Sequence, residues 1–506
     1  MQRILRGAWR RFGLRSSAVH ALWLVPVAAA LLLACGDDPG GAGAGGSSAS
    51  GGSGASSGGG GSSASGGSGA SGGSSASGGA GAGGGSAGSA AAGGSGGSAG
   101  GNQRSLSERI SVSTIQVPAG VAAGDSNWRI WGRGSLHVAP VFATANDGGG
   151  MLVCYTTEAG AAVLVKDRFE AETSELAKGR ECRGLAKADD GGYAALLWDD
   201  AGDRIFLHRY DAKDQLLGVT ELTNPDNKPD DFGIGESRLE YGDGRYGAYY
   251  HVHSDSGHEG DTLKWVDATT GAETTGWGWG CSHSMSNLLR YNPALNGFMP
   301  ACVTDCFPGT TGDFATNSQG GIYLNHNKQK VLDVAAGCNG SVAGELGSAA
   351  LAPDGYKLVF NAHQAPLIKG QQGYDASTMN QDIGFVSIGA DLSPGAVVWL
   401  THTPGINEAD ASIAHFRYTP TPGATDVEQY LVGWAEPGAT YKYWLGRIDA
   451  GGAWLEGPVD VSNQVSWGRR ADPFRESAGG VTWAWFDAPG STALHIAQVD
   501  DGFIVL

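Results

Sequence analysis

The sequence lacks the long apolar runs of an integral membrane protein, and it is poor in basic residues. Its longest apolar run, residues 21–34, is shorter than the roughly 20 residues that a membrane-spanning helix requires. Lysine and arginine together number 33, against 51 aspartates and glutamates, which gives a net charge of −18. Because so acidic a chain is unsuited to a phosphate backbone, we expect no nucleic-acid partner.

Helical periodicity and two common catalytic motifs are also missing. No long stretch repeats apolar residues every three to four positions, so helices should be scarce. The chain has no Walker loop, and the region after residue 102 has no Gly-x-Ser-x-Gly nucleophile motif. These absences indicate a mainly β-structured chain without a standard nucleotide-hydrolysing or serine-hydrolase site.

The N-terminal segment predicts export. Residues 1–34 contain five arginines and no acidic residue, and the apolar run follows them, as in a signal peptide. The run ends in Leu32-Leu33-Ala34-Cys35-Gly36, which resembles the lipobox of bacterial lipoproteins. This resemblance implies that Cys35 is lipidated and becomes the mature N-terminus, on the periplasmic face or at the cell surface. The alternative is an ordinary secretory signal with an incidental cysteine.

Residues 35–102 lack both charge and large apolar groups after the first few positions. From Pro39 to Gly101 the chain is almost wholly glycine, serine and alanine. Such a segment cannot bury enough surface to offset the entropy lost on ordering. We therefore predict a disordered tether with a mean reach of about 45 Å. The remaining residues, 103–506, should form one large β domain.

Seven segments of that domain share one plan, in which a turn rich in glycine, asparagine or proline precedes a short apolar strand. The strands begin at Met151, Tyr193, Tyr246, Phe298, Lys357, Gln429 and Val481. Recurrence at spacings of roughly 40 to 70 residues indicates propeller blades. We predict a seven-bladed β-propeller, with six or eight blades, a β-solenoid or two sandwiches as alternatives.

Further strands complete each unit. A third strand tends to end in Asp-Ala, as at Asp211-Ala212 and Asp267-Ala268. The alternating segment from Ile110 to Val117 should join the last blade and close the ring, because an open propeller would leave an unpaired edge. The decapeptide from Leu351 to Phe360 resembles the Pro-Asp-Gly blade motif of TolB-type propellers, but it occurs once, and no propeller family is assigned.

Six cysteines remain if Cys35 is lipidated, and an even number in an exported chain predicts three disulfides. Cys154 and Cys182 lie on neighbouring units, which suggests one pair. The register of a hairpin around Asn292 suggests a second pair, between Cys281 and Cys306, and the two remaining cysteines would form the third. The expected pairs are Cys154 with Cys182, Cys281 with Cys306, and Cys302 with Cys338.

Histidines gather where we expect the longest loops. Connections after the second and fourth strands of each blade emerge on one face, and in this chain they are long and rich in His, Trp, Asp and Asn. Imidazoles beside carboxylates suit a divalent metal such as Zn²⁺ or Mn²⁺, with Ca²⁺ a further possibility. The alternative is that these groups hydrogen-bond the loops into shape. The candidate metal ligands are His251, His253, His258 and His283.

Tryptophans on the same face favour a second interpretation. Flat indoles beside acidic side chains can stack on sugar rings and hydrogen-bond their hydroxyls. The alternative for each indole is packing between blades. The candidate ligand-binding residues are Trp128, Trp131, Trp277, Trp279, Trp467, Glu259 and Asp261.

Three functions remain compatible with the sequence. The first is a lipid-anchored binding protein of the cell envelope that recognises a glycan or a protein through the loop-rich face. The second is a metal-assisted polysaccharide lyase or hydrolase that uses the histidine cluster. The third is a structural spacer. The sequence does not decide whether the chain is an enzyme.

Overall fold

The computed structural model describes the chain from residue 104 to residue 501, with gaps. The described ranges are 104–124, 138–146, 150–167, 171–199, 201–223, 236–253, 259–277, 281, 286–306, 321–325, 329–333, 341–342, 344–364, 380–417, 428–468 and 472–501. Cys35 and the predicted tether lie outside them. All described residues belong to one compact unit, Ser95–Leu506. No helix within them is long and apolar enough to cross a membrane.

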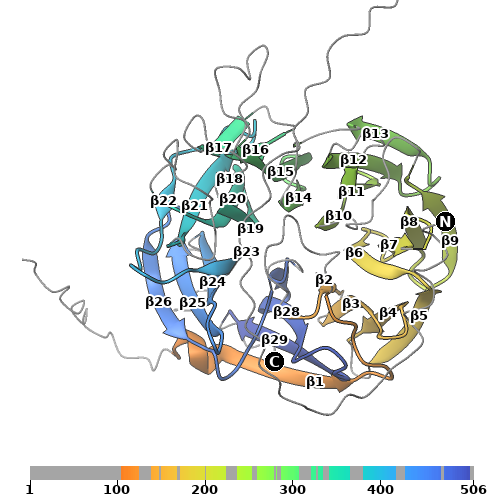
Figure 1. The fold of residues 1–506 in the computed structure, drawn as a ribbon, viewed down its shortest axis with the longest axis horizontal. Coiled ribbons are helices and arrows are strands. Elements are labelled where there is room, and N and C mark those ends of the chain that lie inside the picture. The colour runs from red at the N-terminus through yellow and green to blue at the C-terminus, as the bar shows by residue number, and fades with distance from the viewer. Residues whose placement is uncertain are drawn as a thin grey trace, which may run out of the picture. The chain divides into compact units, whose positions relative to one another are not determined.

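Seven antiparallel sheets in the described residues form a ring (Figure 1). Blade 1 contains β2 (Val141–Ala145), β3 (Met151–Thr156), β4 (Ala161–Lys166) and β5 (Glu172–Lys178). Blade 2 contains β6 (Glu181–Lys187), β7 (Tyr193–Asp199), β8 (Arg204–Tyr210) and β9 (Leu216–Glu221). Blade 3 contains β10 (Ser237–Gly242), β11 (Arg245–His253), β12 (Glu259–Asp267) and β13 (Glu273–Trp277). Blade 4 contains β14 (Ser286–Asn292), β15 (Gly297–Cys306), β16 (Gly321–Leu324) and β17 (Gln329–Asp333), and β18 (Ser341–Val342) pairs with β15.

The other three blades follow the same order from the channel outward. Blade 5 contains β19 (Gly344–Ala352), β20 (Gly355–Ala362), β21 (Asp382–Gly389) and β22 (Val398–Trp399). Blade 6 contains β23 (Ala409–His415), β24 (Gln429–Glu436), β25 (Lys442–Asp449) and β26 (Trp454–Asp460). Blade 7 contains β27 (Arg475–Ser477), β28 (Gly480–Phe486), β29 (Ala493–Asp500) and β1 (Ile110–Gln116), which follows the short 3₁₀ helix η3 (Leu106–Arg109).

The predicted seven-bladed architecture is confirmed. The seven repeated apolar segments are the second strands of the seven blades, namely β3, β7, β11, β15, β20, β24 and β28. Several of their turns use the backbone conformations that the sequence suggested, since Asp243, Gly244 and Asn296 have φ of 51°, 70° and 47°. Glycine and asparagine adopt this left-handed region most readily, which is why they recur there.

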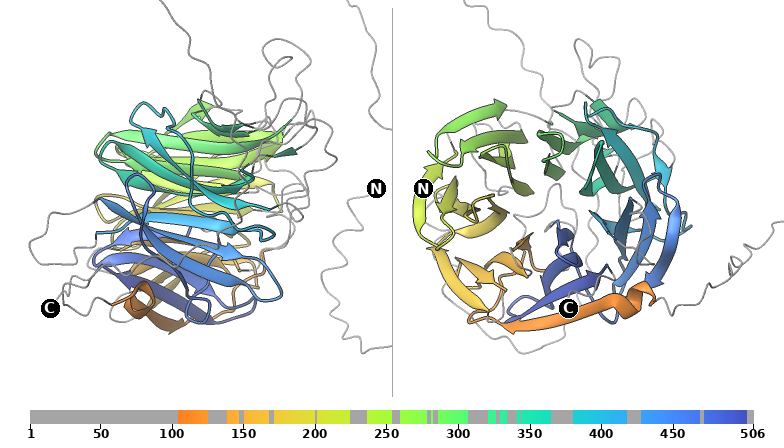
Figure 2. Two further views of the ribbon diagram at one scale, coloured as in Figure 1. Left: turned by 90° about the vertical axis from the view of Figure 1, so that its left-hand side faces the viewer. Right: turned by 180° about the vertical axis from the view of Figure 1, so that it is seen from behind.

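The ring is closed by the N-terminal strand, as predicted. β1 pairs antiparallel with β29, from Ile110 opposite Val499 to Gln116 opposite Ala493 (Figures 1 and 2). The last blade therefore takes its outermost strand from the start of the domain and its other three from the end. This pairing covers an edge that would otherwise be open.

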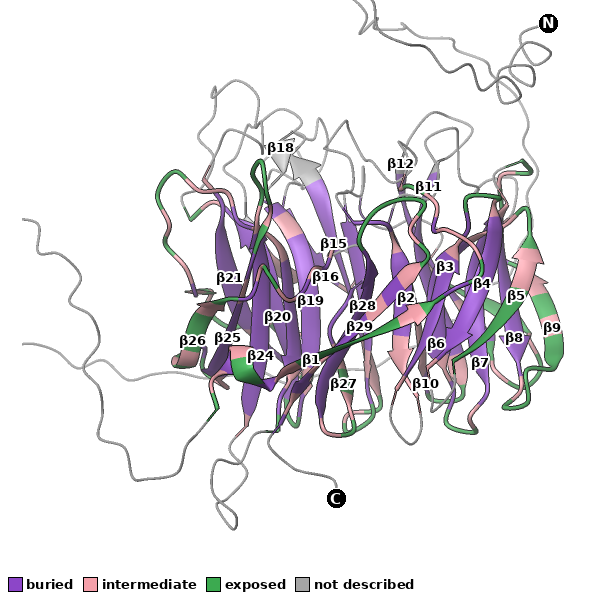
Figure 3. Ribbon diagram, turned by 90° about the horizontal axis from the view of Figure 1, so that it is seen from below, coloured by how far each residue is buried: buried purple, intermediate pink, exposed green. Residues whose placement is uncertain are grey.

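The core lies between the blades rather than in one central cluster. Second strands are buried throughout in blades 5 and 7, whereas the outer strand β9 has mostly exposed residues (Figure 3). Burial on both faces explains the continuous apolar runs that the sequence shows in these second strands. One such interface packs Leu288 and Val303 of blade 4 with Phe360 of blade 5.

The disulfides confirm one predicted pair and correct the other two. Cys154 is bonded to Cys182, which links blade 1 to blade 2. Cys281 is bonded to Cys302, not to Cys306, so the predicted pairs Cys281–Cys306 and Cys302–Cys338 are wrong. The hairpin register reaches only to Ser286 opposite Val303. Beyond that point β15 pairs with β18, which places Cys306 opposite Ser341. Disulfides of this kind are typical of exported proteins.

Candidate functional site

The two ends of the ring differ in the length of their connections. We call loop face the end at which second strands lead to third strands and fourth strands lead to the next blade, and turn face the opposite end (Figure 3). Loop-face connections include residues 278–285, 307–320 and 363–381. Turn-face connections include residues 243–244 and 353–354, and the segments 390–397 and 416–428 are longer exceptions.

Part of the predicted histidine and acid cluster comes together on one hairpin of blade 3. In the ladder between β11 and β12, His251 lies opposite Asp261 and His253 lies opposite Glu259. Directly opposite residues of an antiparallel pair share a face of the sheet. The hairpin points these four positions toward the loop face. The predicted residues Trp128, Trp131, His258, Trp279 and His283 lie outside the described residues.

Asp261 is the centre of a buried polar cluster. It is fully buried, and the Tyr249 hydroxyl donates a hydrogen bond to its Oδ2. Burial raises the pKa of Asp261 to about 7, against the opposing effect of hydrogen bonds from Tyr249, the Cys281 backbone and the Trp277 side chain. The Trp277 ring meets the Tyr249 ring edge-on at 5.8 Å. The cluster therefore braces the end of the blade 3 sheet against the connection that follows it.

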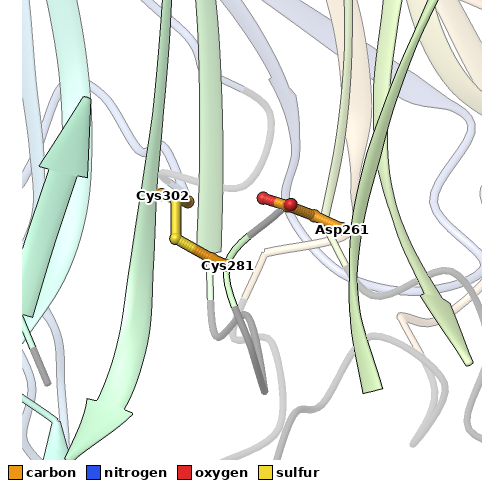
Figure 4. A group of neighbouring side chains, drawn as sticks. All are labelled: Asp261, Cys281 and Cys302. Atoms are coloured by element: carbon orange, nitrogen blue, oxygen red, sulfur yellow. A yellow bond between two sulfur atoms is a disulfide. The ribbon is translucent and has the colours of Figure 1, made fainter. Parts of the chain in front are cut away.

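A disulfide lies within the group of side chains whose ligand atoms are close enough to surround a metal ion. Ligand atoms of Asp261, Cys281 and Cys302 lie within 4.8 Å of one another and all three residues are buried (Figure 4). The two sulfurs are bonded to each other, so neither can be the thiolate that a metal requires. These three residues do not fit a metal ion in the oxidised protein. The four-histidine site stays a prediction, because His251 alone has a described side chain, and that side chain is buried.

The prediction that Trp467 lies on the binding surface is wrong. Its side chain is fully buried, and its indole Nε1 donates a hydrogen bond to the Asp410 carbonyl at 3.1 Å. It packs against Tyr443, Phe474 and Trp483 between blades 6 and 7. The connection after β26 folds back over the blade edge, which turns a loop tryptophan into a core residue. Asp261 is likewise buried, so it cannot contact a sugar as predicted.

A charged cluster in the central channel was missed by the sequence reasoning. Asp472 is 1% exposed and forms ion pairs with Arg290 of blade 4 and, at 3.3 Å, with Arg475. Burial alone would raise the pKa of Asp472, but the guanidiniums of Arg290, Arg475 and Arg238 together lower it to about 2. Because blades 4 and 7 are not adjacent, the Asp472–Arg290 pair spans the channel. We call Arg238, Glu240, Arg290, Asp472 and Arg475 the channel cluster.

The channel cluster borders a cavity of about 180 Å³. Its lining comes from the first strands of six blades and from the residue that precedes β27. The lining residues are Thr144, Ala145, Glu240, Arg290, Ala349, Ala350, Leu351, Ile413, Ala414, His415, Phe474, Arg475 and Glu476. One signal in the sequence could have found part of it, namely the alternating charges Glu236, Arg238 and Glu240 along an inner strand.

Asp261 gives the first testable consequence, which is a loss of stability as the pH rises. Its folded pKa is about 7, whereas an unfolded aspartate titrates at about 3.9. Between these values the folded state holds a proton that the unfolded chain has released, so the free energy of unfolding falls with rising pH. We expect Asp261→Asn to remove this contribution and to raise the Tm relative to wild type at about pH 8.

Thermal unfolding of both proteins at about pH 5 and about pH 8 checks this prediction. Glu408, whose pKa burial also raises to about 7, is present in both proteins, so the difference between them reports Asp261. A Tm difference that is the same at both pH values would contradict the assignment.

The comparisons with known proteins add little to this description. No protein-family model and no curated protein matches the chain. Among solved structures, AofleA from Arthrobotrys oligospora is 10% identical with a TM-score of 0.33, over 70% of this chain and 90% of that one. An endo-arabinase from Bacteroides thetaiotaomicron is 11% identical with a TM-score of 0.29, over 61% and 89%. The β-propeller domain of the Trilobed protease from Pyrococcus furiosus is 8% identical with a TM-score of 0.37, over 69% and 91%.

Similarities this weak carry no inference about function. The fold class follows from the seven sheets themselves. They make the described part of the chain a seven-bladed β-propeller that is closed by its N-terminal strand.

Proposed function

We propose that the chain is an exported binding protein of the cell envelope, anchored to the membrane through a lipidated Cys35, and that it takes its ligand on the loop face. The observation that carries the proposal is the asymmetry of the ring. Connections of 8 to 19 residues, such as 278–285 and 363–381, gather on the loop face, whereas several turns opposite span two residues. Long connections on a rigid scaffold are where binding surfaces usually form.

Binding is favoured over catalysis because two of the side chains that could act as catalytic groups are buried. Asp261 is fully buried and accepts a hydrogen bond from Tyr249, and His251 is also buried. The disulfide Cys281–Cys302 ties the entry of blade 4 to its second strand. These groups hold the loop face in shape, which limits the entropy that a ligand must remove from it.

A glycan is the ligand that we favour, because Trp277 ends β13 at this face with a half-buried indole. We expect full-length protein in detergent to bind members of an array of bacterial polysaccharides. Trp277→Ala should weaken that binding about fivefold, since loss of a stacking ring removes on the order of 1 kcal/mol.

Trp454→Ala is the matched control, because Trp454 is a half-buried tryptophan at the turn-face end of another outer strand. It should leave the binding unchanged. If no polysaccharide binds, or if both variants lose binding equally, the glycan proposal fails and an envelope protein becomes the ligand to seek.

The alternative is a metal-assisted lyase or hydrolase that uses His251, His253, His258 and His283. It is supported by the β11–β12 ladder, which sets His251 opposite Asp261 and His253 opposite Glu259. Imidazole and carboxylate together are ligands that Zn²⁺ and Mn²⁺ accept. Mass spectrometric metal analysis of the full-length protein beside His253→Ala separates the two functions. A stoichiometric metal that the variant loses supports the enzyme, and a metal-free wild type rules out the metal-assisted reaction.

A further inference from the structure

The cavity beside the channel cluster opens on the turn face, away from the proposed ligand surface. The first strand of each blade runs from the loop face to the turn face. In blades 1, 3, 4, 5 and 6 the lining residues lie in the second half of these strands. Arg290 is two residues from the end of β14, and His415 is the last residue of β23. Glu476 is exposed and marks the mouth, where Arg417 contacts it at 3.4 Å and His415 at 3.5 Å.

The polar groups of this cavity are fixed before any ligand arrives. Arg290 Nε donates to the Ala349 carbonyl at 2.8 Å, and Arg475 Nε donates to the Ala143 carbonyl at 3.0 Å. Asp472 forms an ion pair with each of these guanidiniums, and a carboxylate oxygen of Glu240 lies 3.9 Å from the Arg290 guanidinium. Bonds to two different blades leave each guanidinium little rotational freedom. Such preorganisation is what a binding site needs in order to limit the entropy lost on binding.

The charges of the cavity are balanced. Two guanidiniums, from Arg290 and Arg475, are matched by the carboxylates of Asp472 and Glu240. At the mouth, Glu476 has Arg417 and His415 as partners. Because the cations already have acidic partners, the cavity offers no excess positive charge to an anion. It offers fixed N–H donors and carboxylate acceptors side by side, which is the pattern that hydroxyl groups require.

The volume of the cavity and its apolar lining restrict the class of ligand further. A volume of about 180 Å³ corresponds to about six water molecules, which is far smaller than the pocket of a drug-sized ligand. Ile413, Ala414 and Phe474 form an apolar part of the lining. A single sugar ring has hydroxyls on its rim and C–H groups on its faces, so it matches both kinds of surface.

We infer that this cavity is a second binding site, distinct from the loop face, that takes a neutral polyhydroxylated ligand the size of one sugar ring. Fixed guanidiniums donate to hydroxyl oxygens, the carboxylates of Glu240 and Glu476 accept from hydroxyl hydrogens, and the apolar wall covers a ring face. The inference does not depend on the ligand proposed for the loop face.

Saturation-transfer NMR on the full-length protein tests the inference with two matched pairs of probes, glucose beside glucuronate and galactose beside galacturonate. We expect a neutral sugar to bind saturably and its acidic counterpart to bind at least tenfold more weakly. Tighter binding of the acidic member would overturn the neutral ligand class, and absence of saturable binding by both neutral sugars would overturn the site.

Two variants locate the binding. Glu476→Gln replaces one of the two acceptor oxygens at the exposed mouth with an N–H donor and should weaken sugar binding about tenfold. Glu221→Gln, on the outer strand β9, should leave it unchanged. Ala145→Leu leaves every charged group in place and fills part of the cavity, so it should abolish binding. Circular dichroism confirms that each variant is folded. Binding that survives in both cavity variants would overturn the assignment, and loss of binding in Trp277→Ala alone would place the sugar on the loop face.

Discussion

Replacement of Asp472 by asparagine should lower the free energy of unfolding by about 3 to 5 kcal/mol, the usual result of removing one partner from a buried ion pair. Asp472 is 1% exposed and pairs with Arg290 and Arg475, which are held inside the channel. Without the carboxylate, two guanidiniums keep their charges with one acidic partner fewer. Asparagine has nearly the same volume and tolerates the left-handed backbone of this residue, φ 48°, so the change isolates the charge.

Urea unfolding at neutral pH measures this loss. Asp487→Asn is the control, because Asp487 is 65% exposed and its ion pair with His495 at 2.9 Å should contribute no more than about 1 kcal/mol. The pH dependence adds a second readout. The folded pKa of Asp472 is about 2, so its contribution is present above about pH 4 and is lost as the pH falls toward 2. Equal losses in the two variants would contradict the role of the channel cluster.

Removal of the closing strand should have the other large effect. A chain that begins at Pro118 lacks β1 and η3, so β29 presents an unpaired edge and the fully buried Leu106 no longer covers blades 6 and 7. Each lost apolar side chain of that size contributes roughly 1.5 to 3 kcal/mol. We expect a fall in Tm of about 10 °C or more, together with association of chains through the open edge.

Thermal unfolding and size-exclusion chromatography measure this prediction. A chain that begins at Gln103 keeps the closing strand and is the matched control, and its Tm should equal that of the full-length protein. A monomeric protein of unchanged Tm that begins at Pro118 would show that the ring does not need its closure.

The blade plan could be predicted because its signals are local. A turn with positive φ needs glycine or asparagine, and a strand buried on both faces needs a continuous apolar run, so β7 and β28 are visible in the sequence. Closure by β1 followed from the physical argument that an edge must be covered. None of these inferences required knowledge of which blades lie opposite each other.

The candidate sites depend on contacts that the sequence does not encode locally. Extending the β14–β15 register predicted Cys281 opposite Cys306, but β15 leaves that hairpin to pair with β18. Trp467 looked like a loop residue until the chain after β26 folded back between two blades. The channel cluster joins Arg290 to Asp472 across the ring, and such a pair is evident only once the blades are placed.

The closing strand also determines how the propeller responds to tension. β1 starts at the turn face, since Ile110 lies opposite Val499 near the end of β29. Any pull on the chain that precedes residue 104 reaches the ring at this point, where Arg104 forms two hydrogen bonds of 2.8 Å to Asp500 and Arg109 lies 3.9 Å from Glu456 of blade 6. A pulling force therefore acts first on the contacts of Arg104 and Arg109, and it then separates the paired residues of β1 and β29 one pair at a time. The strand pair that closes the ring is therefore also the first part of the ring to bear a force applied to the preceding chain.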